Sequence, residues 1–309
     1  MNAKAKLRAS VIIPTYNREK ELTDCIQSIL EQTEFPYELI VIDDADLKKA
    51  PLKEECKKAG IKYTFQKKKG RCGHPESKNQ AIKISAGNIL IFFDDDVVLF
   101  PDYIKETMNV YRGDKDFQIG GVCGAMQERR SVSVKSHIRR AFEAFFLISG
   151  SREGRVLPSG FCVEFGEASE APTGILDVRF FPGCACSFRK EAIEDVAFTD
   201  QYRKFAFGED KDFSIRIAKK HRLVMNTNAK LHHLESTSMR PDKGREGRMY
   251  IIGKYLFFKW HVKQSGLDWF FFYYAIFGYM FMQFISMVIL PKKGKLERYG
   301  GALGAIMDT

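Results

Sequence analysis

Three consecutive aspartates, Asp94, Asp95 and Asp96, follow the apolar run NILIFF at residues 88–93. Adjacent carboxylates repel one another, so such a cluster is costly unless a cation binds it. Side chains alternate along an extended segment, which places Asp94 and Asp96 on one face and Asp95 on the other. Two carboxylates on one face suit Mg²⁺ or Mn²⁺, which take oxygen ligands and often bind substrate phosphates as well. The alternative is a solvated acidic turn, but the position behind a buried strand favours a metal site.

A second acidic group lies in the segment FGEDKDFSIRIAKKH, where Gly208 precedes Glu209, Asp210 and Asp212. The pattern predicts a helix that begins here, with carboxylates in its first turn, where the helix dipole favours negative charge. One interpretation is therefore a helix cap. The other is a general base, since a carboxylate beside a metal-bound diphosphate can take the proton of an incoming hydroxyl. Spacing alone leaves the two interpretations equal.

Two adjacent histidines, His232 and His233, lie in the segment AKLHHLESTSMRP at 229–241. Alternation along a strand allows only one of them to face the metal site, and a surface histidine pair is the alternative. Together with Cys184 and Cys186 they could instead form a zinc site. Cys-x-Cys spacing is unusual for zinc, so buried free thiols are favoured.

The elements that must position these groups alternate along the first part of the chain. Apolar residues with i, i+3, i+4 spacing predict amphipathic helices, and short β-branched runs predict strands. This alternation predicts an α/β fold, with a mostly parallel sheet and helices on both of its faces. The expected strands are 9–14, 37–43, 61–65 and 88–93, and the expected helices are 18–33, 51–59 and 75–86.

Polar segments follow all four strands: PTYNR, DDAD, KKKGRCGH and DDD. Because ligands of parallel sheets bind outside the carboxyl ends of the strands, we expect one crevice with both acidic and basic groups. No GxGxxG follows the first strand and no GxxxxGK[ST] is present, which disfavours dinucleotide-binding and P-loop sites. Further along, a strand is expected at 120–126, loops over 127–175, and a strand, a turn and a short helix over 175–193.

Composition limits the class of protein. The chain has 309 residues, of which 45% are hydrophobic, and a net charge of +10. It can bury a sizeable core, in one large domain or two smaller ones. Positive charge favours phosphorylated ligands, nucleic acid or an anionic membrane, but no nucleic-acid-binding motif is recognisable, so no such partner is expected. Seven cysteines without a CxxC pair and the lack of an apolar N-terminal segment predict a cytoplasmic location.

Five segments occur in the order and context seen in inverting glycosyltransferases of the family-2 type: SVIIPTYNR, LIVIDDAD, GNILIFFDDD, PGCACSFRKEAI and FGEDKDFSIRIAKKH. The chain resembles this family over residues 9 to about 240. The resemblance implies a GT-A fold and transfer of a sugar, with inversion, from a nucleotide-diphosphate sugar to a hydroxyl of a glycan or polyprenyl-linked acceptor. It also implies dependence on Mn²⁺ or Mg²⁺ and a role in synthesis of cell-surface polysaccharide or glycolipid.

The same resemblance implies roles for individual residues. Asp94 and Asp96 would hold the metal, His233 would complete its site, and Asp210 would be the catalytic base. Glu209 and His232 would lie near the acceptor. The implied nucleotide-binding residues are Pro14, Tyr16, Asn17, Arg18, Asp43, Asp44, Arg71, Lys78, Asp94 and Asp95.

The family pattern suggests three functional ranges: a nucleotide-sugar-binding half at 1–112, an acceptor-binding and catalytic half at 113–240, and a C-terminal helical segment at 241–309. The chain departs from the pattern at Ala45 and Asp46, where Gly-Ser is common, and at Lys78 and Ala81, where Arg and Gly are usual. One alternative is a metal-dependent nucleotidyltransferase, which would be expected to have a Gly-rich basic loop after its first strand. A catalytically inactive sugar-nucleotide-binding relative is the other, and intact DDD and GED segments argue against it.

The stretch from Trp269 to Leu290 contains no charged residue. A membrane-spanning helix needs about 20 apolar residues, so length permits a span. Basic residues lie on both sides, however, and positive charge prefers the cytoplasmic side. Many aromatic residues, with Gly278 near the middle, favour a break into a hairpin or two in-plane helices at the membrane interface. We expect peripheral, monotopic attachment to an anionic membrane surface; packing on the catalytic domain or on a second subunit, as in an oligomer, is the alternative. The flanking basic residues are Lys254, Lys259, Lys263, Lys292, Lys293, Lys295 and Arg298.

Overall fold

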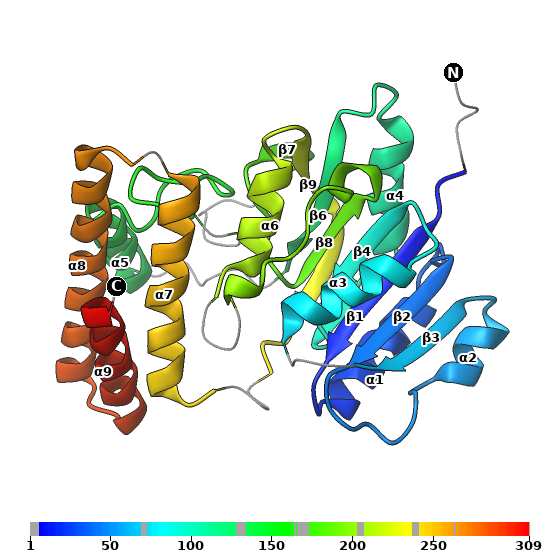
Figure 1. Cartoon of the computed structure of the whole chain (residues 1–309), viewed down its shortest axis with the longest axis horizontal. Helices are drawn as coiled ribbons and strands as arrows, with labels where there is room; N and C mark the ends of the chain where they lie inside the picture. Colours follow the sequence, from blue (N-terminus) through cyan, green and yellow to red (C-terminus); the bar gives the residue numbers. More distant parts are fainter. Residues whose placement is uncertain are drawn as a thin grey trace. The chain divides into compact units, whose positions relative to one another are not determined.

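The computed structural model of the chain describes residues 6–68, 73–127, 134–163, 165, 173–202, 207–236, 241–262 and 264–308. Strands and helices alternate through its first part, and helices dominate its end (Figure 1). The strands are β1 (Ala9–Thr15), β2 (Glu38–Asp43), β3 (Lys62–Lys67), β4 (Ile89–Phe93), β5 (Val97–Leu99), β6 (Ile119–Met126), β7 (Ile175–Val178), β8 (Ala185–Arg189) and β9 (Arg222–His233). The helices are α1 (Glu19–Leu30), α2 (Lys53–Lys58), α3 (His74–Ile84), α4 (Tyr103–Gly113), α5 (Val134–Phe145), α6 (Glu209–Ile217), α7 (Lys243–His261), α8 (Gly266–Ile289) and α9 (Lys293–Asp308), with 3₁₀ helices η1 (Glu191–Ile193) and η2 (Asp200–Tyr202).

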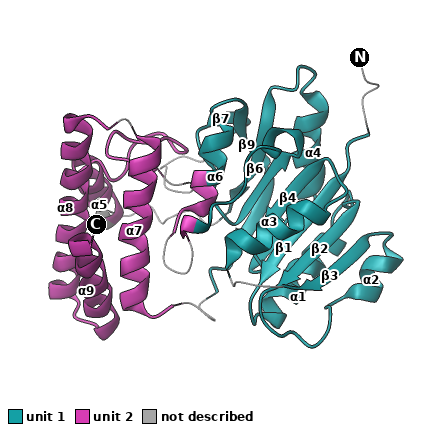
Figure 2. Cartoon of the chain, viewed as in Figure 1, with its two compact units in different colours: residues 1–128, 172–200, 213–239 teal, residues 129–171, 201–212, 240–309 magenta. Residues whose placement is uncertain are grey.

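The chain forms two compact units that interleave along the sequence (Figure 2). Their boundary passes through α6, so that Glu209–Ile217 begins in unit 2 and ends in unit 1. The three functional ranges expected from the sequence divide the chain differently and stay a prediction. Unit 1 consists of Met1–Glu128, Pro172–Asp200 and Phe213–Met239, and unit 2 of Arg129–Ala171, Gln201–Asp212 and Arg240–Thr309.

Unit 1 contains a mixed sheet with the strand order β3-β2-β1-β4-β8-β6-β9-β5, with β7 paired to β9. The first four strands in this order are parallel, as the sequence predicts. Beyond β4 the sheet is mixed rather than mostly parallel, because β8 runs antiparallel to both β4 and β6. The sheet flanked by helices confirms the predicted α/β fold class.

Alternate residues of the central strands face opposite sides of the sheet, as the pleat of a strand requires. Val11 and Ile91 belong to a buried cluster with the apolar side of α1, including Ile26. On the opposite face, Phe92 lies against Phe198, with 5.7 Å between ring centroids. This two-sided burial holds the carboxyl ends of the parallel strands in a fixed frame.

Two expectations for the second half of the chain were wrong. The segment 127–175, expected to be loops, contains α5, because apolar residues at Ile138, Phe142 and Phe146 recur with helical spacing among charged neighbours. The segment 175–193, expected to contain one strand before its short helix, contains both β7 and β8. The second of these is short and wholly buried between β4 and β6, where pairing partners on both sides stabilise it.

Unit 2 contains α5, α7, α8, α9 and the first turn of α6. Its core contains stacked rings. The ring centroids of Phe258 on α7 and Phe272 on α8 are 4.5 Å apart, and those of Tyr250 and Tyr279 are 4.6 Å apart. The expected break at Gly278 was wrong, since α8 is one continuous helix. A Cβ at Gly278 would collide with the ring of Phe146, so this glycine permits close packing of α8 on the end of the α5 segment.

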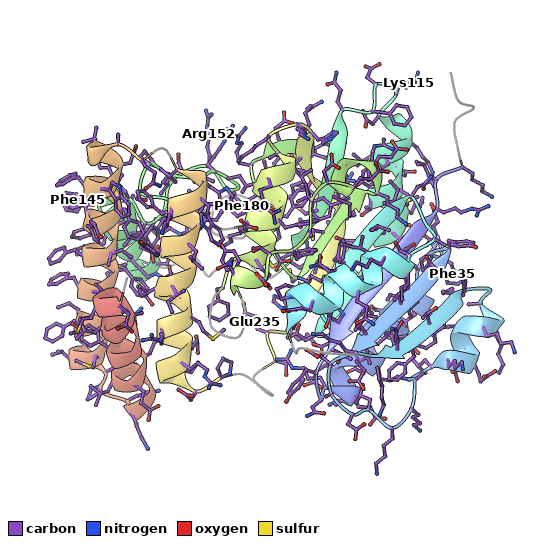
Figure 3. All side chains as sticks on the ribbon, in the orientation of Figure 1. Phe35, Lys115, Phe145, Arg152, Phe180 and Glu235 are labelled. Carbon is purple, nitrogen blue, oxygen red and sulfur yellow. The ribbon has the colours of Figure 1, made fainter. Side chains whose placement is uncertain are left out.

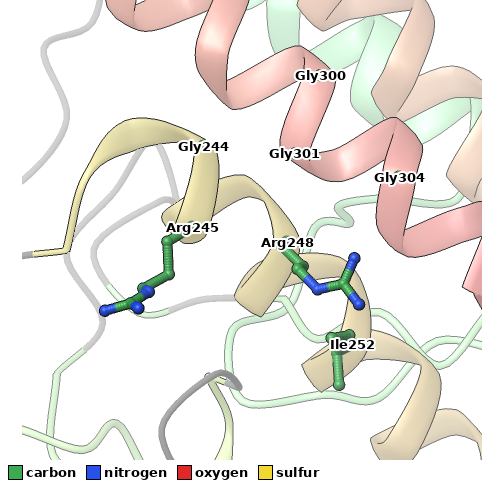
Figure 4. A pocket seen from close by; sticks show the side chains of 7 residues that line it. All are labelled: Gly244, Arg245, Arg248, Ile252, Gly300, Gly301 and Gly304. Carbon is green, nitrogen blue, oxygen red and sulfur yellow. The ribbon is translucent and has the colours of Figure 1, made fainter.

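A groove of about 450 Å³ lies between α7 and α9 in unit 2 (Figure 4). Its glycines bring the helices close together, since a Cβ at Gly301 would collide with the backbone of Gly244. Arg248 at its side forms an ion pair with Asp308, with 2.6 Å between Nη2 and Oδ2. The groove is lined by none of the residues that the sequence predicts for the site, and its lining residues are Gly244, Arg245, Arg248, Ile252, Gly300, Gly301 and Gly304.

Candidate functional site

The candidate site lies at the carboxyl edge of the parallel strands in unit 1. Thr15 at the end of β1 is in register with Asp43 at the end of β2, and Asp43 is in register with Lys67 at the end of β3. Asp94 follows the end of β4 directly, and β4 pairs with β1. The sheet therefore places the first residues of the four predicted polar segments along one edge.

Asp94, Asp96 and His233 form a cluster in which one ligand atom from each residue lies within 4.8 Å of the others. Asp96 is buried, and the other two side chains are half-buried. Two carboxylates and an imidazole are suitable donors for Mn²⁺ and, through the carboxylates, for Mg²⁺. The donor set of this cluster thus fits the divalent cation that the sequence predicts.

Antiparallel pairing of β5 with β9 determines which histidine joins the cluster. Val97, the residue after Asp96, pairs with His233, and His233 Nε2 lies 3.2 Å from Asp96 Oδ1. His232 pairs with the next residue, and its ring lies 5.0 Å from the ring of Phe100. The structure therefore brings His233, and not His232, to the aspartates.

Asp96 has further partners that hold its carboxylate in place. The backbone N–H of Ser236 donates to Oδ2 at 2.9 Å, and Nη1 of Arg18 lies 3.6 Å from the same oxygen. Burial acts to raise the pKa of Asp96, but the hydrogen bond from His233, the Ser236 N–H and the nearby positive charges together lower that pKa below its ordinary value. The carboxylate is therefore stabilised in its ionised form, the form that binds a cation.

The pKa of His233 is shifted in the opposite direction. Burial acts to lower this pKa, but the hydrogen bond to Asp96 and the charges of Asp94 and Asp96 raise it overall. The imidazole is thus electrostatically coupled to both carboxylates of the cluster.

Asp95 is not a member of this cluster. It lies with Asp96 in a turn between β4 and β5, so the expected strand alternation does not set its direction. Oδ2 accepts a hydrogen bond from the Thr15 hydroxyl at 2.8 Å, and Oδ1 accepts one from Arg18 Nη1 at 3.0 Å. Burial raises the pKa of Asp95. The hydrogen bonds from Thr15 and Arg18 lower this pKa, but by less than burial raises it. Asp95 braces the loop after β1; contact of this residue with a nucleotide stays a prediction.

The residues predicted to bind the nucleoside lie at the ends of β1 and β2. Pro14 is buried within β1, Tyr16 is exposed, and Asn17 has a left-handed backbone with φ of 52°. Both carboxylate oxygens of buried Asp43 accept backbone N–H groups of its own loop, at 3.0 and 2.8 Å. Asp44 accepts the N–H of Gly73 at 2.7 Å. Asp43 therefore shapes the loop, while Asp44 ties it to the start of α3.

Lys78 and Arg71 are the two basic residues predicted to neutralise the diphosphate. Lys78 is buried in α3, with Nζ 5.2 Å from the ring centroid of Phe198. Its predicted phosphate contact stays a prediction. Arg71 lies outside the described residues.

Glu209 and Asp210 lie in the first turn of α6, in the part of the helix that belongs to unit 2. The preceding Gly208 has φ of +123°, a conformation that favours glycine. Both carboxylate side chains are half-buried. The helix start is as the sequence predicts, and the role of Asp210 as a base stays a prediction.

Some residues of the site were not found from the sequence. The Ser236 hydroxyl donates to Glu21 on α1 at 2.7 Å, so the end of β9 is linked to α1 beside the metal cluster. No local pattern indicates this contact, because the two residues are 215 positions apart. Thr15 could have been found, since a hydroxyl at the end of a buried strand is a candidate partner for a carboxylate at the end of the next.

Comparison with known proteins identifies the family. The sequence model of the protein family described as glycosyl transferase family 2 matches residues 10–196, which are more than half of the 309-residue chain. The chain belongs to glycosyl transferase family 2. This family 2 membership confirms the resemblance inferred from the sequence, and it favours glycosyl transfer over the nucleotidyltransferase alternative.

Individual relatives of this family 2 chain match only part of it. An uncharacterized glycosyltransferase of Bacillus subtilis, YwdF, is 31% identical over 100 residues, which cover 32% of this chain and 37% of that protein. Glycosyltransferase GlyG of Streptococcus pneumoniae is 30% identical over 122 residues, which cover 36% of this chain and 38% of GlyG. The matched parts thus span little more than a third of each relative.

Solved structures similar to this family 2 chain match nearly its whole length. A mannosyltransferase from Pyrobaculum calidifontis, PcManGT, in complex with GDP-Man and Mn²⁺, has a TM-score of 0.56 at 15% identity and covers 98% of this chain and 88% of its own. S. aureus TarS 1–349 in complex with UDP-GlcNAc has a TM-score of 0.54 at 14% identity and covers 98% of this chain and 81% of its own. At these identities the likeness shows the fold alone, and it confirms the predicted GT-A fold.

Proposed function

We propose that this family 2 glycosyltransferase moves a sugar from a nucleotide-diphosphate sugar to an acceptor hydroxyl, with inversion and with a bound divalent cation. The observation that supports this most directly is the cluster of Asp94, Asp96 and His233 at the carboxyl edge of the parallel strands. Similar folds hold GDP-Man with Mn²⁺ and UDP-GlcNAc. Mn²⁺ or Mg²⁺ held here would neutralise negative charge that develops on the departing diphosphate.

The chain's own residues have distinct tasks in this proposal. Asp94 and Asp96 bind the cation, and Arg18 and the Ser236 N–H hold Asp96 ionised and oriented. Asp43 and Asp44 shape the loop on which the nucleoside lies. Preorganised charges of this kind cost no rearrangement during the reaction.

Asp210 takes the proton of the acceptor hydroxyl in this proposal. The acceptor oxygen then forms its bond to the anomeric carbon while the bond from that carbon to the diphosphate breaks, and the nucleoside diphosphate leaves. One displacement inverts the anomeric configuration and requires no covalent enzyme intermediate. Asp210 lies in the first turn of α6, where the helix dipole favours negative charge and where a capping residue would also lie.

A panel of nucleotide sugars with added Mn²⁺ tests the proposed function. Release of a nucleoside diphosphate, with a product of inverted anomeric configuration by NMR, is the expected result. A parallel assay supplies a nucleoside triphosphate and a sugar 1-phosphate; release of pyrophosphate from that mixture would instead indicate a nucleotidyltransferase. Binding of nucleotide sugars without turnover, with every acceptor and metal tested, would indicate the inactive relative.

We also propose that α8 and α5 attach the protein peripherally to an anionic membrane, where a polyprenyl-linked acceptor would lie. In the described part of the chain, α8 is the one helix long and apolar enough to cross a bilayer. Its outer face is a row of exposed apolar residues, and Phe145 of α5, which meets Tyr274 of α8, lies beside it (Figure 3). Phe145 is 68% exposed, and Ile138 of the same α5 is 66% exposed. The exposed residues of α8 are Leu267, Phe270, Tyr273, Phe277, Phe281, Phe284, Ile285, Val288 and Ile289.

The packing of α8 supports attachment in the plane of the membrane rather than a span. Its inner face lies along α7, through Phe272 on Phe258 and Tyr279 on Tyr250. A spanning α8 would take α7, with Lys254 and Lys259 along its length, into the hydrocarbon, at about 2.5–3.5 kcal/mol for each charge. An in-plane α8 leaves these charges outside the hydrocarbon, where basic residues contact anionic headgroups.

A further inference from the structure

A buried histidine–aspartate pair joins α6 to α7 within unit 2. His261 Nε2 lies 2.7 Å from Asp212 Oδ1, and both side chains are 3% exposed. Because the partner is a carboxylate, Nε2 is the hydrogen-bond donor, and a charge-assisted bond in a buried place is strong. Asp212 is two residues after Asp210, so this bond fixes the first turn of α6 against α7.

The chain just before α6 is also held against α7. A Cβ at Gly253 would collide with the carbonyl oxygen of Phe207, so the backbone of Phe207 lies directly on this glycine. The ring of Tyr202 meets the ring of Trp260 edge to face, with 5.7 Å between centroids. The segment with Glu209 and Asp210 is thus attached to α7 on both sides.

Helix geometry determines where Asp210 points when Asp212 faces α7. Asp212 N–H donates to the Gly208 carbonyl at 2.8 Å, so the first turn of α6 is formed. Residues two positions apart in an α-helix are separated by about 200° around its axis. Asp212 faces α7, and Asp210 therefore faces away from it. Rotation of this turn would move the Asp210 carboxylate directly.

We propose that His261 is a positioning residue for the transfer reaction: through Asp212 it fixes the rotation of the first turn of α6 and hence the direction of Asp210. This inference rests on the proposed role of Asp210 as general base. A misplacement of about 1 Å at a reacting group can cost on the order of 100-fold in rate, so a distant anchor of this kind has a large effect.

The chemistry of the pair supports positioning over simple packing. Among the described residues, Nδ1 of His261 is buried and has no hydrogen-bond partner. A buried polar nitrogen without a hydrogen-bond partner costs stability, and an apolar residue of similar size would avoid that cost. Such a residue would, however, leave the buried Asp212 carboxylate without the hydrogen bond from the imidazole. The hydrogen bond that Nε2 donates to Asp212 therefore accounts for a histidine at this position. Another side chain that donates a hydrogen bond from the same distance should preserve the function of His261.

The test compares His261→Leu with His261→Gln by steady-state kinetics on the full-length protein. The amide nitrogen of Gln reaches about as far as Nε2 and can donate. We expect H261L to lower kcat about 10- to 100-fold, with the KM for the nucleotide sugar changed less than about 3-fold, and H261Q to retain most of the rate. His137→Leu, an exposed histidine of the same unit, is the matched control and should have the wild-type kcat.

A double-mutant cycle with Asp210→Asn separates positioning from general destabilisation. If His261 acts through Asp210, H261L should lower the rate of D210N by less than about 2-fold, because the carboxylate it positions is already gone. A loss as large as in the wild-type background, or an unchanged kcat in H261L, would overturn the inference. If D210N itself is fully active, the proposed function of Asp210 is wrong, which is a separate result.

A second comparison applies if H261L does not fold. His261→Asn keeps an amide donor but is too short to reach Asp212, so its kcat should be about 10-fold or more below that of H261Q at equal thermal stability. Equal kcat values for the Asn and Gln variants would overturn the inference.

Discussion

Val97 and His233 pair across the antiparallel strands β5 and β9, and this pairing brings the His233 imidazole to 3.2 Å from the Asp96 carboxylate. His232 pairs with Val98 and points to the other side of the strand, where its ring meets Phe100. Two adjacent residues of one type are thus assigned different environments by strand register alone. This difference provides a matched pair of variants.

His233→Ala should raise the Mn²⁺ concentration needed for half-maximal activity about 10- to 100-fold, the range typical of lost metal-site partners. His232→Ala should change it less than about 3-fold, because His232 lies outside the cluster. Metal titration of both purified variants is the measurement. An equal shift in both would mean that the histidines act on the strand and not on the metal.

Asp96→Ala should lower turnover about 100-fold or more. The variant would lose the divalent cation, whose positive charge stabilises the leaving diphosphate. Chelation of divalent cations should have the same effect on the wild-type protein, and added Mn²⁺ or Mg²⁺ should reverse it. Asp116→Ala, an exposed aspartate of the same unit, is the control. Undiminished transfer in the presence of chelator would contradict metal dependence.

Asp210→Asn should keep nucleotide-sugar binding but lower kcat about 10²- to 10⁴-fold, the range typical for loss of a general base. The substitution is nearly isosteric, so the helix start should persist. Calorimetric titration with the donor distinguishes the two roles. If binding and thermal stability are lost together with rate, Asp210 is a structural cap of α6.

Phe270→Glu with Phe277→Glu should release the protein from anionic liposomes in a flotation gradient, because both side chains are 61% exposed on the outer face of α8. Phe117→Glu makes the same type of substitution once, at an exposed phenylalanine of unit 1, and this variant should still float; each of the two α8 substitutions is also tested singly against it. If the wild-type protein stays at the bottom of the gradient, the membrane proposal is wrong, and a second copy of the chain becomes the expected occupant of the face.

These substitutions are a sharper test than truncation after about residue 265. Truncation removes α8 and α9, and it would expose core residues such as Ile251 and Phe258 of α7. A truncated protein that leaves the membrane fraction could therefore simply be misfolded. Charged substitutions on an exposed face leave this core intact.

Gly278→Ala should destabilise the protein by about 1–3 kcal/mol, the usual cost of overpacking, because the new methyl group meets the Phe146 ring. Phe146→Leu should restore part of the loss in the double variant. Gly300→Ala is the matched control: nothing lies within 4 Å of its Cβ position, and it should stabilise α9 by about 0.5–1 kcal/mol. Denaturant unfolding of the variants measures the differences in the free energy of unfolding. If G278A is as stable as the wild-type protein, α8 does not pack closely on the Phe146 ring.

Local patterns were sufficient for the first part of the fold. Buried β-branched strands and amphipathic helices have distinct periods, so β1 to β4 and α1 to α3 could be predicted, and with them the position of Asp94 and Asp96. Local patterns did not choose between the two histidines, because alternation states that one of them faces inward but not which one; the family resemblance supplied the choice of His233, and the structure agrees with it. That choice depends on pairing with β5, more than a hundred residues earlier.

Glycine and long-range packing explain the errors in the second part. Gly278 in an apolar stretch resembles a helix break, but α8 is continuous there, and the close approach of Phe146 explains why this position is a glycine. In α5, charged residues between Ile138 and Phe142 concealed the helical period. The link from Ser236 to Glu21, and the pair of His261 with Asp212, join segments too distant in sequence for any local pattern.

The attachment of Tyr202, Phe207 and Asp212 to α7 has a consequence for recombination between relatives. A chimera that exchanges only residues 241–309 would introduce a foreign α7 beneath the native Asp212, and would retain neither His261 nor the space at Gly253 unless the donor happens to provide both. The exchangeable module is instead discontinuous and must include Gln201–Asp212 and Arg129–Ala171 as well. Family members that differ in their C-terminal helices are therefore expected to differ in a correlated way in the few residues that follow the GED aspartate, so that changes in one segment accompany changes in the other.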